Sequence, residues 1–249
     1  TSFITSKVSP IVFMLVFLAF TAWIVYRGVE HGIEKFSKII MPGLTLLIIF
    51  IAIFSLTLSH EGSDGTVRTG LQGLAIYLRP DFTGLTFKRF LEILLDAMSQ
   101  LFFSLSVSMG IMITYGSYMK KEVKLESSVK QIEVFDFGIA FIAGLMIIPA
   151  VFAFNGGENL NAGPGLMFIM LPKVFGAMKF GSAVGALFFL LVLFAALTSA
   201  ISLMETIVSI IQDQFHWNRR LTCIIVMLAA IAVGIPSSLG FGAWGNVKP

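Results

Sequence analysis

Charge, cysteine and histidine are all scarce in this sequence. Asp, Glu, Lys and Arg make up 12% of its 249 residues, about half of the roughly 25% that is usual in soluble domains, which argues against a soluble globular core. Cys223 is the only cysteine and there are three histidines, so a disulfide within the chain and a metal site spaced like a Cys/His cluster are excluded. Neither HExxH nor GxSxG occurs, and we expect neither an enzyme nor a cofactor.

Long apolar stretches take the place of the missing charge. Hydrophobic residues make up 57% of the chain. A helix needs about 20 apolar residues to cross a bilayer core, whereas the strands of a membrane barrel are about 10 residues long and alternate in polarity. The sequence therefore predicts an all-α, polytopic membrane helix bundle that forms one transmembrane domain over residues 1–249. The expected spans are 8–27, 38–59, 93–119, 134–157, 180–212 and 221–247.

The basic residues lie between the apolar stretches and form no continuous stripe. The formal net charge is only +3, so we expect a lipid bilayer as the partner and no nucleic acid. Segments 27–38, 120–133 and 213–220 hold their basic residues in compact stretches, whereas the other basic residues are diluted over longer ones. Because short cytoplasmic loops are enriched in Lys and Arg, we place these three segments in the cytoplasm.

Two longer segments fall on the opposite side. Residues 60–92 form a polar stretch, and residues 156–179 contain Gly-Pro-Gly at 163–165. The uncharged run 159–171 is too short to span the bilayer and is interrupted by these residues, so we expect a re-entrant or surface helix there. The chain starts at Thr1 without an initiator Met, and we expect it to be a piece of a longer protein.

The third apolar span contains a weak point. Residues 106–110 read Ser-Val-Ser-Met-Gly, which combines hydroxyls that compete for backbone hydrogen bonds, a β-branched residue and a glycine. We expect a helix break there, and irregular backbone at this depth is tolerated only where it lines a cavity or is buried in protein. The alternative is that the small residues only allow close helix packing.

Polar residues also follow one broad stripe of the fifth span. Its members are Ala195, Thr198, Ser199, Ser202 and Glu205. Carbonyl and hydroxyl oxygens grouped in this way suit a hard cation such as Na⁺. The alternative is that the hydroxyls bond back to carbonyls of their own helix.

Asp136 lies at the start of the fourth expected span and is the most specific single candidate for a functional residue. A charge inside a membrane helix is costly, by about 2.5–3.5 kcal/mol at mid-helix on insertion scales. One interpretation is an acid that faces inward and neutralises a cation. The other is an interfacial carboxylate near a helix N-terminus, which the helix dipole favours.

Several of these residues lie in stretches that resemble a known family. Residues 100–118, which begin Gln-Leu-Phe-Phe-Ser-Leu-Ser, resemble the sixth transmembrane segment of the neurotransmitter:sodium symporters, particularly the prokaryotic branch. Residues 27–42 resemble the link into segment five, 144–152 resemble segment seven, and 194–205 resemble segment eight. The resemblance implies that the chain covers about segments four to nine of a twelve-helix transporter. It also implies a multi-pass protein of a bacterial or archaeal plasma membrane.

The resemblance further implies an inverted-repeat fold with sites near the bilayer midplane. Ser104 and Asp136 match positions of a first sodium site. Ala195, through its carbonyl, Thr198 and Ser199 match a second. Positions that surround the substrate in the family are matched by Phe103, Ser106, Met109, Ser199 and Leu203. Gln100 and Ser104 also match positions that hold chloride in chloride-dependent members.

Two residues shape the expected function. Many members have Asn where this chain has Asp136, and the chloride-dependent members keep a hydroxyl where it has Ala140. We therefore expect chloride-independent, sodium-coupled symport by alternating access. Met109, a flexible apolar side chain at a position that is often aromatic in the family, hints at a hydrophobic amino acid as substrate. The alternative function is a proton-coupled amino-acid permease of related fold, which sodium dependence of uptake would distinguish.

Overall fold

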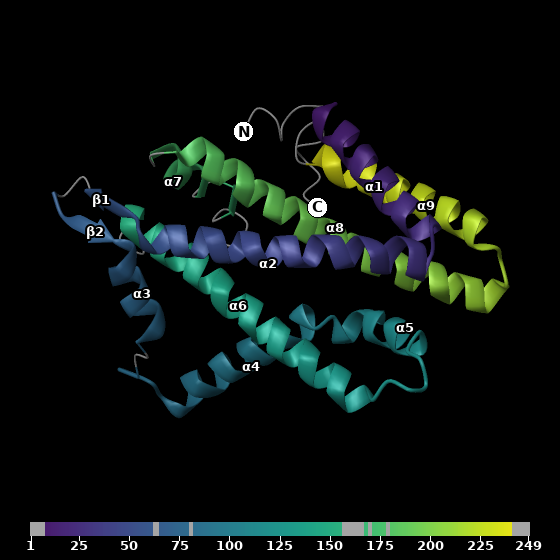
Figure 1. Ribbon diagram of the computed structural model, residues 1–249, viewed down its shortest axis with the longest axis horizontal. Coiled ribbons are helices and arrows are strands. Elements are labelled where there is room, and N and C mark those ends of the chain that lie inside the picture. Colours follow the sequence, from purple (N-terminus) through teal and green to yellow (C-terminus); the bar gives the residue numbers. More distant parts are fainter. Residues whose placement is uncertain are drawn as a thin grey trace. The chain divides into compact units, whose positions relative to one another are not determined.

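The computed structural model describes residues 8–61, 65–79, 82–155, 167–168, 171–177 and 180–240. These residues form helices and connecting turns apart from one short antiparallel ribbon, in which β1 (Ser59–Glu61) pairs with β2 (Val67–Thr69) (Figure 1). The α-helices are α1 (Ser9–Tyr26), α2 (Lys35–Leu56), α3 (Gly70–Leu78), α4 (Phe87–Ser104), α5 (Ile111–Ser117), α6 (Leu125–Asn155), α7 (Leu171–Ala177), α8 (Gly181–Phe215) and α9 (Arg219–Gly240). The predicted helical class is thereby confirmed.

The chain divides into two compact units. The first comprises residues 1–40, 109–118 and 195–249, and the second comprises 41–108 and 119–194. In the first unit α1 and α9 pack side by side. They are antiparallel, because Arg219 at the start of α9 donates from Nε to the carbonyl oxygen of Val25 near the end of α1, at 2.9 Å. The buried core of this unit is formed by Ala22, Ile24, Val25, Ile33, Leu197, Ile201, Met204, Val208, Cys223 and Val226.

In the second unit α3 lies against α6. Gly73 makes this close approach possible, because a Cβ atom there would come within 2.7 Å of the Pro149 Cα atom. A capping box fixes the start of α3: Thr69 Oγ1 accepts from the Gln72 amide, and Gln72 Oε1 accepts from the Thr69 amide. The buried core of the second unit is formed by Ile48, Ile51, Ala52, Met146, Val151, Leu171, Phe175, Val184 and Phe188.

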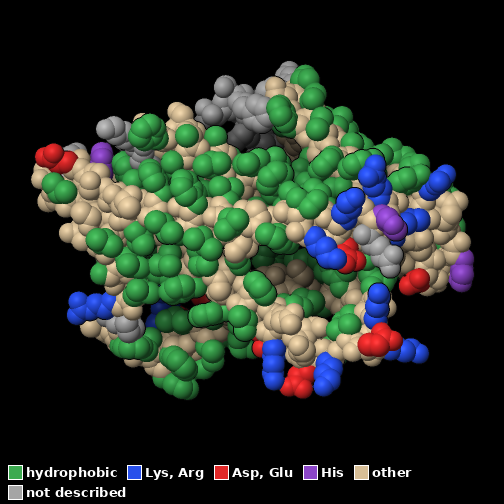
Figure 2. Space-filling model, viewed as in Figure 1, with side chains coloured by type: hydrophobic (Ala, Val, Ile, Leu, Met, Phe, Trp, Pro, Cys, Tyr) green, Lys and Arg blue, Asp and Glu red, His purple; other side chains and the backbone are tan. Residues whose placement is uncertain are grey.

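Within the described residues, five helices are long and apolar enough to cross a membrane. They are Ser9–Tyr26, His31–Leu56, Leu125–Phe154, Gly181–Phe215 and Arg219–Leu239. Hydrophobic side chains cover most of the face in view (Figure 2), as expected for helices whose outer surface meets lipid tails. The remaining expected range, 93–119, holds α4 and α5 as two separate helices.

Several helices start earlier than the sequence predicts. Hydropathy marks α6 from residue 134, but the helix begins at Leu125, and α4 begins at Phe87 instead of 93. The extra turns carry charged side chains, including the ion pairs Lys130–Glu126 and Arg89–Glu92. Such turns continue a helix beyond its apolar part, so a search for charge-free stretches misses them. For the same reason, the expected loops 60–92 and 120–133 are partly helical.

The expected re-entrant or surface helix at 159–171 lies almost entirely outside the described residues. Only Met167, Phe168 and Leu171 of that range are described, and Leu171 begins the short helix α7.

Candidate functional site

The predicted helix break is present between α4 and α5. Ser104 is the last residue of α4 and Leu105 is its C-cap, Ser106 has a φ of 54°, and Gly110 has a φ of 74°. Between these two left-handed residues the backbone forms one 3-10 turn, Val107–Met109. A residue with a left-handed backbone cannot continue a right-handed helix, so Ser106 prevents α4 from continuing into the turn that follows. The prediction of an interrupted helix near 106–110 is confirmed.

Ser104 and Asp136 are joined in the second unit. Ser104 Oγ, in the last residue of α4, donates to Asp136 Oδ1 on α6. The two residues are 32 positions apart in the sequence, and the fold brings them together next to the break. Asp136 is half-buried, and its second carboxylate oxygen has no protein partner among the described residues. The two side chains therefore offer three oxygen atoms close to irregular backbone.

The interpretation of Asp136 as a helix-terminal carboxylate is wrong. Because α6 begins at Leu125, Asp136 lies three turns into the helix, beyond the reach of the N-terminal dipole. The error follows from the charged turns that precede it.

The other second-unit candidates stand on α4 or just after it. Asp96, Gln100 and Ser104 follow one face of α4 at steps of four residues. Phe103 is 65% exposed, and Ser106 is half-buried at the break. No residue of α4 is buried.

Ala195, Thr198 and Ser199 form a second group, in the first unit. Thr198 Oγ1 donates to the Ala195 carbonyl oxygen at 2.9 Å, so two of the expected sodium ligands are in contact. This bond also matches the alternative that the hydroxyls bond back to their own helix. Ser199 is exposed, and its hydroxyl makes no hydrogen bond within the described residues. Leu203 is exposed and Met109 is half-buried.

Ser202 and Glu205, the last two residues of the expected cation stripe, bind to other protein groups. Ser202 Oγ lies 2.9 Å from Tyr115 Oη and donates to the Thr198 carbonyl at 3.1 Å. Glu205 is fully buried, and it accepts from Tyr118 Oη at 2.8 Å. Glu205 is therefore held by protein groups, and Ser202, like Thr198, bonds to a carbonyl of its own helix, as the alternative interpretation of the stripe expects.

A buried ion pair accounts for Glu205. Arg219 Nη1 donates to Glu205 Oε1 at 3.1 Å, and Nη2 donates to Oε2. The same guanidinium donates twice to the Val25 carbonyl, from Nε at 2.9 Å and from Nη2 at 2.7 Å. Sequence reasoning missed this contact because it assigned Arg219 to a loop. A single acid inside an apolar span requires a partner. The presence of Glu205 in the fifth span could therefore have predicted a basic residue close to it.

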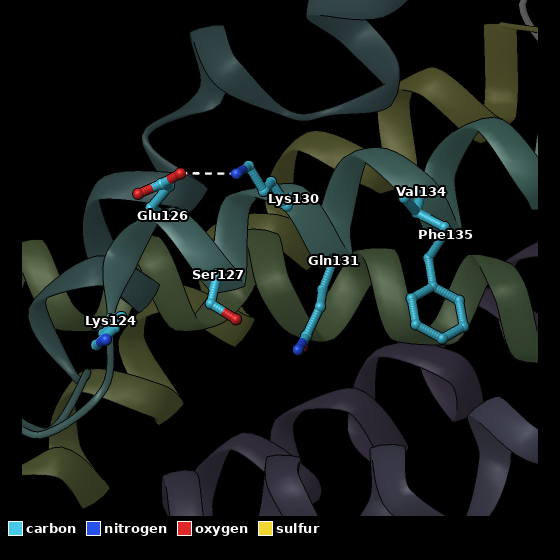
Figure 3. Close-up of a pocket in the computed structure, with 7 residues that line it drawn as sticks. All are labelled: Lys124, Glu126, Ser127, Lys130, Gln131, Val134 and Phe135. Atoms are coloured by element: carbon cyan, nitrogen blue, oxygen red, sulfur yellow. Dashed lines mark hydrogen bonds and ion pairs between the residues drawn. The ribbon is translucent and has the colours of Figure 1, made fainter.

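A separate groove of about 490 Å³ follows the first turns of α6. Its lining residues are Lys124, Glu126, Ser127, Lys130, Gln131, Val134 and Phe135 (Figure 3). Lys130 and Glu126 pair with each other, while Ser127, Gln131 and Phe135 point to the other side of the helix. None of the predicted site residues lines this groove.

The geometry as a whole is that of a membrane helix bundle in which one helix is interrupted beside oxygen-bearing side chains. This combination is typical of secondary-transporter folds. No group of three or more His, Cys, Asp or Glu residues that could hold a metal ion occurs in the described part of the chain.

Comparisons with known proteins agree with this class. The model of the sodium:neurotransmitter symporter family matches residues 5–243. The sodium-dependent transporter YhdH of Bacillus subtilis is 37% identical over 246 residues, which is 99% of this chain and 51% of that protein. The sodium-dependent dopamine transporter of Bos taurus is 25% identical over 236 residues, 91% of this chain and 32% of that protein.

A crystal structure provides the same comparison in three dimensions. The structure of MhsT in complex with L-phenylalanine matches with a TM-score of 0.81 and 40% sequence identity, over 100% of this chain and 53% of MhsT. The chain belongs to the sodium:neurotransmitter symporter family. It spans about half the length of YhdH and of MhsT.

Proposed function

We propose that the protein carries a small hydrophobic amino acid across a bacterial or archaeal plasma membrane together with Na⁺, by alternating access and without chloride. The observation that carries the proposal is the contact between Ser104 and Asp136 beside the helix break. It would supply a carboxylate and a hydroxyl beside the interruption, and transporters of this fold bind their ions where helices are interrupted. Membership of a family whose relatives are named sodium-dependent transporters supports the choice of cation.

The first sodium ion would bind at Asp136 and Ser104. Hard cations prefer oxygen ligands, and the carboxylate supplies the negative charge that offsets loss of the hydration shell. The Ser104 hydroxyl would turn its hydrogen away from Asp136 to present a lone pair to the ion. A substrate carboxylate would complete this site, so that each ligand raises the affinity for the other.

A second sodium ion would bind at the Ala195 carbonyl and the hydroxyls of Thr198 and Ser199. The 2.9 Å separation of Thr198 Oγ1 from the Ala195 oxygen supports the idea that both oxygens reach one ion. Each sodium charge that crosses 100 mV of membrane potential contributes about 2.3 kcal/mol, which drives uptake against a substrate gradient.

Phe103, Ser106, Met109, Ser199 and Leu203 would surround the substrate. Most of these side chains are apolar, and Met109 adapts its shape easily, which favours a hydrophobic amino acid. MhsT, with which the chain shares 40% identity, is seen with L-phenylalanine, and this supports the same substrate class.

Chloride independence would follow from Asp136 and Ala140. A fixed carboxylate beside Na⁺ supplies the charge that chloride supplies in other members, and Ala140, one turn further along α6, has no hydroxyl to hold an anion.

The deciding experiment is uptake of labelled L-phenylalanine by the full-length protein in proteoliposomes. We expect uptake in Na⁺ buffer, little in K⁺ buffer, and no change when gluconate replaces chloride. Asp136→Asn should lower sodium-driven uptake by about tenfold or more. Equal uptake in Na⁺ and K⁺ would contradict the central proposal, and loss of uptake in gluconate would contradict only chloride independence.

A further inference from the structure

Two arginines stand over aromatic rings at one end of the antiparallel pair α1 and α9. The guanidinium carbon of Arg27 lies 4.0 Å from the centre of the Trp23 ring. The guanidinium carbon of Arg220 lies 5.7 Å from the centre of the Tyr26 ring. Within the described residues, no carboxylate forms an ion pair with either arginine. Their neighbour Arg219, by contrast, is held by Glu205.

These rings and arginines lie where two candidate membrane spans end. One span ends at Tyr26, and the other begins at Arg219. The contact of Arg219 with the Val25 carbonyl holds the two ends side by side. Aromatic side chains and arginines gather at the boundary between lipid tails and water, where an apolar body and a polar tip can both be accommodated. The two cations therefore belong at headgroup level.

An exposed apolar stripe leads away from each arginine along its helix. On α1 the stripe consists of Trp23, Phe20, Val16 and Phe13, which follow Arg27 at alternating steps of four and three residues on one helix face. All four are exposed, Val16 by 63% and Phe13 by 65%.

The stripe on α9 is shorter. Ile224 and Leu228 follow Arg220 at steps of four residues, and both are at least half exposed. A phosphate ester bound at the arginines would thus have room for its acyl chains along both helices.

We propose that Arg27 and Arg220, with the rings of Trp23 and Tyr26, bind the headgroup of an anionic phospholipid whose acyl chains lie along the exposed stripes of α1 and α9. The guanidinium fork matches two phosphate oxygens at once. The two positive charges, which pair with no carboxylate in the described part of the chain, favour an anionic lipid over a zwitterionic one. The apolar stripes favour a lipid over free phosphate, because a soluble anion makes no use of them.

The test is native mass spectrometry of the full-length protein titrated with phosphatidylglycerol or phosphatidylcholine in detergent. Each arginine near an anionic headgroup contributes about fivefold in affinity, so Arg27→Gln with Arg220→Gln should weaken the tightest phosphatidylglycerol binding by about 25-fold. Binding of phosphatidylcholine, whose phosphate charge is offset by its choline group, should weaken by a clearly smaller factor. The matched control, Arg89→Gln with Lys130→Gln, removes the same charge from exposed ion pairs elsewhere and should shift binding less than twofold.

Further variants separate the alternatives. Arg27→Lys with Arg220→Lys keeps both charges, and it should retain more phosphatidylglycerol than the Gln pair even if the Gln pair folds poorly. Phe13→Ser with Val16→Ser should weaken lipid binding through the stripe. An equal loss in the matched control would overturn the proposal, as would displacement of the bound lipid by excess glycerol 3-phosphate. Because the readout is lipid binding, the result does not depend on sodium-coupled transport.

Discussion

Arg219 holds the buried carboxylate of Glu205 with both of its terminal nitrogens and, with the same guanidinium, caps the carbonyl of Val25. The side chain of Arg219 thus links the start of α9 to the middle of α8 and to the end of α1. The arrangement pairs the charge of Glu205, and it adds a second donor to the Val25 carbonyl, which also accepts from the Gly28 amide at 3.0 Å.

Removing one member of this pair should cost more stability than removing both. Arg219→Met leaves a buried carboxylate with Tyr118 as its main partner, and we expect the free energy of unfolding to fall by about 3–5 kcal/mol. Arg219→Met with Glu205→Leu should recover much of this loss, because no buried charge remains. Chemical unfolding of the full-length protein in detergent micelles measures both values.

The ion pair Lys130–Glu126 on α6 provides the control. Both side chains are largely exposed, 70% and 80%, and such pairs contribute little, so Lys130→Met should not shift the unfolding midpoint measurably. An Arg219→Met protein as stable as the parent would contradict the importance of the buried pair.

Gly73→Ala should loosen α3 from α6. The new methyl group would meet the Pro149 Cα atom at 2.7 Å and the Phe152 Cβ atom at 3.0 Å. Backbone atoms cannot give way as a flexible side chain can, so we expect a loss of about 1–3 kcal/mol. Thermal unfolding of the full-length protein provides the measurement.

Gly138→Ala is the matched control on α6. A Cβ atom at Gly138 meets nothing within 4 Å, and alanine is the better helix former by about 1 kcal/mol, so this variant should be unchanged or more stable. If both substitutions lowered the unfolding temperature equally, the tight contact at Gly73 would not be the cause.

Thr198→Val should weaken the use of sodium without unfolding the protein. Valine keeps the shape of threonine but removes the hydroxyl that contacts the Ala195 carbonyl. We expect the sodium concentration for half-maximal uptake to rise by about tenfold or more, as for loss of a hydrogen-bonding group that faces a charge. Thr206→Val, two turns along the same helix, removes a hydroxyl that bonds only to the Ser202 carbonyl, and it should leave the sodium dependence as it was.

Chloride dependence should be transferable to this chain. Asp136→Asn removes the fixed charge, and adding Ala140→Ser supplies a hydroxyl one turn away on α6. We expect the double variant to take up substrate in chloride but not in gluconate, whereas Ala140→Ser alone should ignore chloride. Identical uptake of the double variant in both anions would show that the charge of Asp136 does not substitute for chloride.

The main features of the fold follow from composition and local chemistry. Long uncharged runs can cross a membrane only as helices, and the run Ser106–Gly110 contains the residues that end a helix most readily. The five long apolar helices agree with the first expectation, and the irregular turn between α4 and α5 confirms the second. The candidate residues Ser104 and Asp136 could be selected because each is a polar group in an apolar segment.

The remaining features depend on contacts that no local pattern reveals. Helix α3 is only nine residues long and gains its place from the fit of Gly73 against Pro149, which lie 76 positions apart. The pairing of Arg219 with Glu205 requires that α8 and α9 fold back on each other. When each apolar span is considered separately, Arg219 looks like a loop residue. Its pairing with Glu205 can be recognised only once the two helices are placed side by side.

Two hydrogen bonds fix how α5 lies on α8. The Tyr115 hydroxyl is hydrogen-bonded to Ser202, and the Tyr118 hydroxyl donates to Glu205. The partners are three residues apart on each helix and follow in the same order, so α5 and this part of α8 run in the same direction. Turning α5 by a single residue, about 100°, would break both bonds together. The two bonds therefore fix the register of α5 on α8. If α5 moved relative to α8, both bonds would break together, so we expect the two helices to move as one body.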